Sequence, residues 1–169
     1  LNHHLGKEND AHQDFRNNIN TWYDEHQKGN LDAILSNTSG CGTTMKDYGF
    51  IFKDNEKMRK KAKIISDLTK DVSEYLNENL KLNFKSKEKK YKIAYHSACS
   101  MQHGQKVHNQ PIELLTKTSN EIMEIPEGHI CCGSAGTYNI LQTEIAKELL
   151  SKKIKNIESL KPDFISTGN

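Results

Sequence analysis

The chain has 169 residues, 34% of them hydrophobic, which suits one or two small domains. Its 24 basic and 22 acidic residues leave a net charge of +2, so the charge balance gives no reason to expect a nucleic-acid partner. No apolar run approaches the length of a membrane span, and the N-terminus does not resemble a signal peptide. The four cysteines lack the paired spacing of a disulfide framework, which favours a reducing compartment and metal binding.

The first half begins with a long helical pattern. We expect a helix over about residues 10–28, with Phe15, Ile19 and Trp22 on one face, and then a short buried strand at 31–35. A turn-rich loop follows the strand and contains Cys41. Because open α/β sheets place their ligands at the C-terminal ends of the strands, Cys41 is a candidate metal ligand. An inert, half-buried thiol is the alternative.

Residues 55–80 show apolar side chains at helical spacing and predict one long helix or a helix pair. We expect the spaced residues to lie in the core; they are Ile64, Ile65, Leu68, Val72, Tyr75 and Leu76. Residues 81–92 are rich in lysine and lack a periodic face, which predicts a solvated connector, with contact to a negatively charged partner as the alternative. We therefore divide the chain into residues 1–80, a linker at 81–90 and a second unit at 91–169.

The second half alternates strands with helices. The patterns predict strands at 91–95, 122–125 and 163–166, and helices at 111–118 and 142–160. The residues of the last helix that we expect to face the core are Ile145, Leu149, Ile154, Ile157 and Leu160. This alternation predicts an α/β fold with parallel strand packing.

The most informative stretch is the loop before the last helix, which contains Cys131, Cys132, Gly133 and Gly136. Adjacent cysteines in a glycine-bracketed turn make a poor disulfide, but a loop can direct both thiolates toward one centre. The glycines permit positive φ and close backbone approach, so amide N–H groups can face the sulfurs. The helix N-terminus that follows favours anionic thiolates. Together with Cys99, this loop predicts a metal or iron–sulfur site, with buried structural cysteines as the alternative.

Histidines are further candidate ligands. His96, His103 and His129 adjoin the cysteines in sequence, and His3 and His4 lie at the start of the chain; capping, surface or backbone-bonding roles are the alternatives. Zinc is the main competitor for the metal, but structural zinc sites usually use C-x-x-C spacing, which does not occur here. The sequence shows no Ser-His-Asp order, phosphate-binding glycine loop or close carboxylate pair, so we assign no catalytic residue.

Two blocks of sequence carry a resemblance to a known family. The first is Tyr95-His96-Ser97-Ala98-Cys99-Ser100-Met101-Gln102-His103-Gly104-Gln105, and the second is Cys131-Cys132-Gly133-Ser134-Ala135-Gly136-Thr137-Tyr138. The chain resembles the CCG cysteine-rich domain of heterodisulfide reductase and, most closely, the glycolate oxidase (glycolate dehydrogenase) iron–sulfur subunit. The resemblance covers essentially the whole chain. It implies an α/β fold of two duplicated Rossmann-like CCG units, with short parallel sheets flanked by helices.

The resemblance also implies a site and a function. Cys99, Cys131 and Cys132, with Cys41 in the other half, would bind an iron–sulfur cluster of the 4Fe-4S type, and Gly133 would shape the cofactor loop. The chain would be an electron-transfer subunit of an oxidoreductase acting on glycolate. It would relay electrons from flavin-binding glycolate oxidase subunits toward a quinone-linked acceptor. The chain alone is not expected to be active.

The same resemblance implies a cytoplasmic protein without a membrane span, and it allows peripheral association of the complex with the inner face of the membrane. Two alternatives stay open. One is an iron–sulfur subunit of a lactate-utilisation or heterodisulfide-reductase-type complex. The other is a zinc-stabilised interaction module.

An internal repeat supports the duplicated architecture. Asp32-Ala33-Ile34-Leu35-Ser36 and Asp163-Phe164-Ile165-Ser166 each follow a helix and run into a turn. Cys41 lies nine residues after Asp32, so the second copy predicts a cysteine three positions beyond Asn169. The same comparison predicts a CCG-like turn at or just before Leu1. We therefore expect an internal fragment of a longer protein, in which the cluster could be absent because ligands at both ends are missing.

Overall fold

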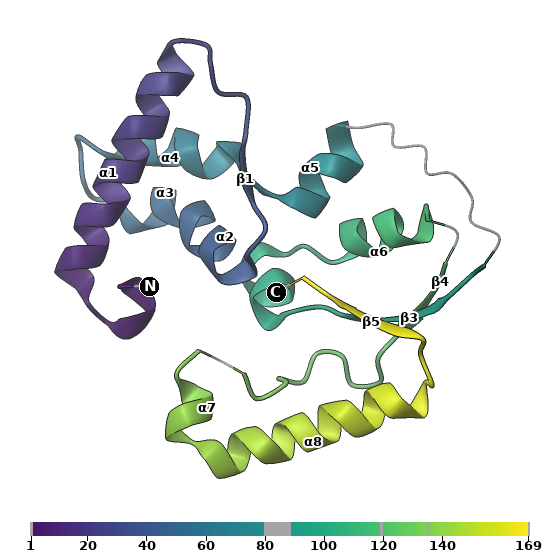
Figure 1. Ribbon diagram of the computed structural model, residues 1–169. Helices are drawn as coiled ribbons and strands as arrows, with labels where there is room; N and C mark the ends of the chain where they lie inside the picture. Colours follow the sequence, from purple (N-terminus) through teal and green to yellow (C-terminus); the bar gives the residue numbers. More distant parts are fainter. Residues whose placement is uncertain (1, 80–88, 119, 135, 169) are drawn as a thin grey trace. The chain divides into compact units, whose positions relative to one another are not determined.

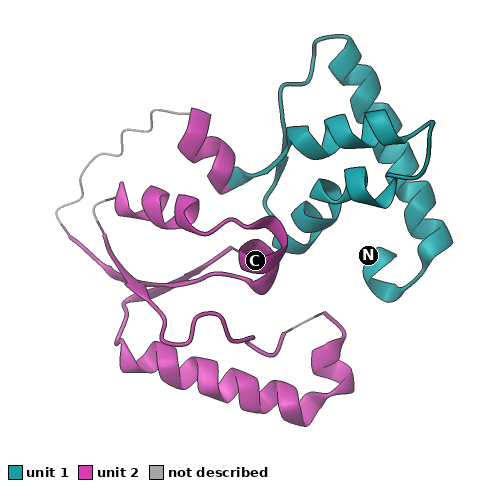
Figure 2. Cartoon of the chain, turned by 180° about the vertical axis from the view of Figure 1, so that it is seen from behind, with its two compact units in different colours: residues 1–72 teal, residues 73–169 magenta. Residues whose placement is uncertain are grey.

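The computed structural model describes residues 2–79, 89–118, 120–134 and 136–168. These form two compact units, which divide between Val72 and Ser73 (Figure 2). Most of the connector expected at 81–90 lies outside the described residues. Within the part that is described, every helix is too short or too polar to cross a bilayer.

The first unit is mainly helical, with a small parallel sheet (Figure 1). Its elements are η1 (His3–Leu5), α1 (Glu8–Gln27), β1 (Ile34–Ser36), α2 (Ser39–Lys46), α3 (Tyr48–Ile51), α4 (Arg59–Leu68) and β2 (Thr69–Asp71). Strands β1 and β2 pair in parallel, with Ile34 opposite Thr69.

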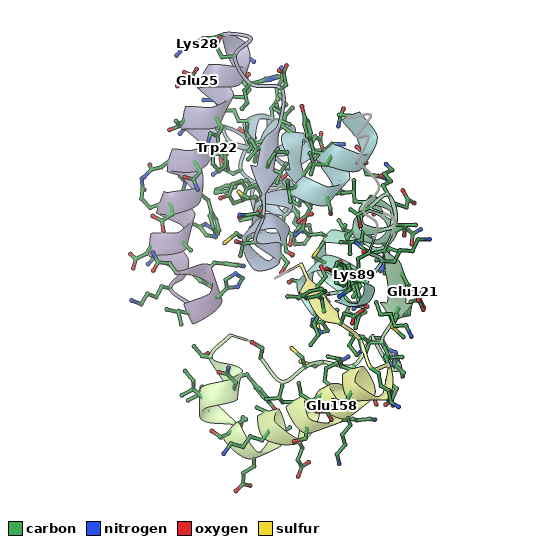
Figure 3. The ribbon with its side chains drawn as sticks, turned by 45° about the vertical axis from the view of Figure 1, so that its right-hand side comes forward. Trp22, Glu25, Lys28, Lys89, Glu121 and Glu158 are labelled. Carbon is green, nitrogen blue, oxygen red and sulfur yellow. The ribbon has the colours of Figure 1, made fainter. Side chains whose placement is uncertain are left out.

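The core of the first unit lies between α1, α3 and α4. The helix predicted at 10–28 is confirmed as α1, and the face of α1 that carries Phe15 and Ile19 is buried, as expected. Phe15 stacks at an angle on Tyr48, with ring centroids 4.9 Å apart. Trp22 packs at the edge of this core. At the end of α1, Glu25 and Lys28 form an exposed ion pair (Figure 3).

The helix pair expected as one possibility for residues 55–80 is confirmed as α4 and α5 (Val72–Asn79), with strand β2 between them, where Thr69–Asp71 pair with β1. One expectation for this part of the chain is wrong. The loop predicted around Cys41 is instead helical from Ser39, so Cys41 lies in the first turn of α2. The hydroxyls of Thr43 and Thr44 donate to carbonyls four residues earlier, so these turn-favouring residues find hydrogen-bond partners within the helix.

The second unit is a three-stranded parallel sheet covered by helices. Its elements after α5 are β3 (Lys92–His96), η2 (Ser100–Gln105), α6 (Asn109–Thr116), β4 (Glu121–Glu124), α7 (Tyr138–Leu141), α8 (Thr143–Ser159) and β5 (Phe164–Thr167). The strand order is β4-β3-β5, with α6 on one face of the sheet and α8 on the other (Figure 1). The predicted strands and the α/β fold with short parallel sheets flanked by helices are confirmed.

The buried face of α8 differs from the expected one. Ile157 is buried, but Ile145 and Ile154 are 50% and 41% exposed, so their predicted core positions are wrong. Ala146 and Lys153 are buried instead. The core-facing stripe thus follows positions 146, 153 and 157, and one of its members is a lysine whose ammonium group finds acceptors inside the unit.

Candidate metal centre

The topology of the second unit brings two loops to one edge of its sheet. Strands β3 and β4 are parallel neighbours, so the segments that follow them leave from the same edge. Cys99 comes three residues after the end of β3 and immediately before η2, a single stretch of π-helix. The segment after β4 carries Cys131 and Cys132. The sheet therefore places both cysteine-bearing loops together, as the sequence predicts.

The three cysteines of this unit come close to one another. All are free thiols and half-buried. The Cys99 and Cys131 thiols are hydrogen-bonded to each other, and Cys132 lies within electrostatic reach of Cys99. Burial, followed by the neighbouring Cys131 thiol, raises the pKa of Cys99 above its usual value. The metal-free protein therefore keeps Cys99 as a neutral thiol near neutral pH.

The backbone of the CCG loop faces a sulfur. The Gly133 amide donates a hydrogen bond to Cys131 Sγ at 3.3 Å. Gly133 has φ +87°, and a Cβ at this position would overlap the Ala146 carbonyl oxygen in the first turn of α8. Gly136 also has a positive φ, of +57°. The prediction that these glycines serve positive φ and close backbone approach is confirmed for Gly133, while Gly136 shows the positive φ alone.

Two side chains tie the loops to each other and to α8. Gln102 Nε2 donates to the carbonyls of Ser97 at 2.7 Å and Gly128 at 3.4 Å, which joins the Cys99 segment to the CCG segment. Lys153 Nζ, on α8, donates to the carbonyls of Glu127 at 3.2 Å and Gly128 at 3.3 Å. Sequence reasoning missed both residues. Hydropathy places Lys153 in solvent, and no local pattern identifies Gln102 as a bridge between the loops.

The histidines differ in their surroundings. His96 Nδ1 lies 3.3 Å from Thr167 Oγ1 on β5, and its Nε2 is buried without a hydrogen-bond partner among the described residues. Burial and then the charge of Lys153 lower the pKa of His96 below its usual value. His103 and His129 are exposed. His96 and His129 line an open pocket of about 330 Å³ at this edge of the sheet.

Cys41 belongs to the first unit and has a separate environment. Its side chain is exposed and lines an open pocket of about 430 Å³, together with His3, His4 and Tyr48. His3 also packs edge-on against Phe15, with ring centroids 5.5 Å apart. The structure thus groups Cys99, Cys131 and Cys132 in one unit and places Cys41 with the N-terminal histidines in the other.

The donor chemistry of the second unit fits a thiolate-bound group. Three thiols and an amide-to-sulfur hydrogen bond are what iron–sulfur proteins use for ligation and for tuning. As they stand, no three His, Cys, Asp or Glu side chains in the described ranges converge closely enough to hold one metal ion. Cys99, Cys131 and Cys132 are the residues that would hold such a group.

Comparison with known proteins supports the resemblance seen in the sequence. Residues 93–169 match the model of the CCG cysteine-rich domain family, as the two cysteine-containing blocks predict. The resemblance to the glycolate oxidase iron–sulfur subunit is also confirmed: the chain is 34% identical to that subunit of Escherichia coli (strain K12) over 171 residues, which cover 100% of the chain and 41% of the relative.

Other relatives are more distant. The chain is 26% identical over its full length to the probable glycolate oxidase iron–sulfur subunit of Bacillus subtilis (strain 168), covering 38% of that protein. Over 90% of the chain it is 25% identical to lactate utilization protein A of Bacillus subtilis (strain 168), covering 62% of that protein. The chain spans about two fifths of the length of the glycolate oxidase subunits.

Proposed function

We propose that this chain is part of an iron–sulfur electron-transfer subunit of an oxidoreductase that oxidises glycolate. The observation that carries the proposal is the grouping of Cys99 and Cys131, with Cys132 nearby, beside the Gly133 amide. The similarity to glycolate oxidase iron–sulfur subunits over the full chain supports it. When bound, an iron–sulfur cluster accepts and releases single electrons without acid–base groups.

The residues of the second unit have definable roles in this proposal. Cys99, Cys131 and Cys132 would bind the cluster, and Gly133 would donate an amide hydrogen bond to a ligand sulfur. Cys41 would serve the first unit in the same way. A 4Fe-4S type is our choice because the resemblance to iron–sulfur subunits of this family implies it.

The electrons and protons released by the substrate can be followed through a flavin-binding partner, this subunit and a quinone. Oxidation of a 2-hydroxy acid to a 2-oxo acid releases two electrons and two protons. A flavin-binding partner would take both electrons from glycolate, this subunit would pass them on singly, and a quinone would accept both together with two protons. The complex would act in the cytoplasm or at the inner face of the membrane.

Substitution of one proposed ligand tests the proposal. In the full gene product that contains this chain, Cys132→Ser should lower iron and acid-labile sulfide in proportion to the loss of one cluster. Ser134→Ala is the matched control, since it alters an exposed residue of the same loop and removes no sulfur. Unchanged iron and sulfide in Cys132→Ser would contradict the assignment.

A lactate-oxidising complex is the second candidate, and the similarity to lactate utilization protein A favours it. The two substrates can be separated in the purified complex. Glycolate is expected to bleach the visible absorbance of the oxidised complex faster than lactate. Faster bleaching by lactate would assign the chain to the lactate branch.

A further inference from the structure

Lys153 is buried inside the second unit, where lysine is rarely found. Only 4% of its surface is exposed. Burial of an ammonium group is unfavourable unless it is hydrogen-bonded or paired with opposite charge. The two carbonyls that it contacts are neutral, and no carboxylate pairs with it within the described ranges. Its charge therefore lacks a counter-ion among the described residues.

The position of Lys153 links it to both cysteine-bearing loops. The two carbonyls belong to the turn at Glu127 and Gly128, three to four residues before Cys131. The Gly128 carbonyl also accepts a hydrogen bond from Gln102, three residues after Cys99. Lys153 thus binds, from α8, the turn at which the Cys99 segment and the CCG segment are joined.

The thiols of the candidate site could supply the missing counter-charge once they are ionised. Lys153 acts on both the Cys99 thiol and the His96 ring. Cys99, the thiol on which Lys153 acts, lies beside Cys131 and within electrostatic reach of Cys132, and thiolates form when such thiols bind a metal group. Glu127, the carboxylate on the same turn, pairs instead with the exposed Lys152 at 2.8 Å.

We propose that Lys153 is a positioning residue for the candidate cluster: it fixes the CCG loop beside Cys99, and its buried charge raises the reduction potential of the group bound there. This inference rests on the proposed function. One-electron reduction makes a thiolate-ligated cluster more negative by one charge, and Lys153 would stabilise that reduced form more than the oxidised form. The electron comes from the redox partner.

An anaerobic redox titration followed by EPR tests the charge. Lys153→Met keeps most of the apolar stem and removes the charge, and it should shift the midpoint potential of the second-unit cluster to a more negative value. Lys153→Arg should restore most of the wild-type potential. The control is Lys152→Met, which removes an exposed neighbouring charge and should leave the potential unchanged. Equal potentials in wild type and Lys153→Met, or an equal shift in Lys152→Met, would overturn the inference.

Amide hydrogen exchange of the metal-free protein tests the positioning separately. Exchange of the segment around Gly128–Cys132 should be faster in Lys153→Met than in wild type, with little change in Lys152→Met and partial recovery in Lys153→Arg. Unchanged exchange in Lys153→Met would overturn the positioning role even if that variant binds no cluster. A wild-type protein without iron and sulfide would overturn the proposed function and the charge role together, whereas a cluster of unshifted potential would overturn the Lys153 inference alone.

Discussion

Gly133 packs against Ala146 so closely that a Cβ at residue 133 would overlap the Ala146 carbonyl oxygen. This contact seats the CCG loop on the first turn of α8, with the Gly133 amide directed at Cys131 Sγ. The residue therefore meets two demands at once, because its φ of +87° also lies in the region that favours glycine.

The first prediction concerns this contact. Gly133→Ala should lower the free energy of unfolding by about 3–5 kcal/mol, from backbone strain plus overlap with α8. Gly136→Ala is the matched control, because Gly136 has a positive φ but open space around it, and it should cost only about 1–2 kcal/mol. Urea denaturation measures both. If both variants lose the same free energy of unfolding, the close contact between Gly133 and Ala146 does not contribute to stability.

The second prediction concerns the reactivity of Cys99. Since burial and the Cys131 thiol raise its pKa, less thiolate is present at a given pH and alkylation is slower. In the metal-free protein, the rate of iodoacetamide reaction at Cys99 should reach its midpoint above the ordinary cysteine value of about 8.5. Peptide mapping of the alkylated protein locates the reaction, with the exposed Cys41 as internal reference. A pH midpoint for Cys99 alkylation at or below the ordinary cysteine value would contradict a raised pKa for this thiol.

The third prediction concerns pH and His96. The folded-state pKa of His96 is lowered, so the unfolded state binds more protons as the pH falls through the ordinary histidine value of about 6.5. The stability of the second unit should therefore decrease on acidification below that value and be fully present above it. Thermal melts from about pH 7.5 to 5 measure the effect, since this window brackets the ordinary histidine value.

A variant and an NMR titration identify the group responsible. His96→Asn keeps a polar side chain beside Thr167 and should flatten the stability profile over this pH window. In Lys153→Met the His96 pKa should rise, because one of the two causes that lower it is gone. The same pH dependence in His96→Asn as in wild type would assign it to another group.

The fourth prediction uses the register of α8. Ile145→Ala should change the free energy of unfolding by only about 0.5 kcal/mol, since the side chain is half exposed. Ile157→Ala should cost about 2–4 kcal/mol, because Ile157 packs with Ala94 and Ile125 in the core. The two variants make the same chemical change in one helix. If Ile145→Ala lowers the free energy of unfolding more than Ile157→Ala does, Ile145 faces the core, as its apolar spacing predicts.

This register shows where sequence reasoning stops. The existence of α8 and of the three parallel strands follows from periodicity and from the alternation of elements. The buried face of α8 does not, because hydropathy assigns Lys153 to solvent while the fold offers its ammonium group two carbonyls. A polar residue in a core position is recognised only when its acceptors are known.

Some residues of the candidate site could be predicted from the sequence, and others could not. Cys99, Cys131 and Cys132 could be predicted, because adjacent cysteines and positive-φ glycines are visible in the sequence and parallel strands bring their loops together. The helical setting of Cys41 could not, since serine, glycine and threonine usually indicate a loop, whereas here they form a helix in which the Thr43 and Thr44 hydroxyls donate to carbonyls four residues earlier. The bridging role of Gln102 likewise depends on a turn that no local pattern specifies.

The most direct test of an iron–sulfur role is anaerobic iron, sulfide and zinc analysis with EPR, on the full gene product that contains this chain. We expect iron and acid-labile sulfide together, with a paramagnetic signal that appears or disappears on reduction. Zinc without sulfide, or no metal at all, would contradict an iron–sulfur role.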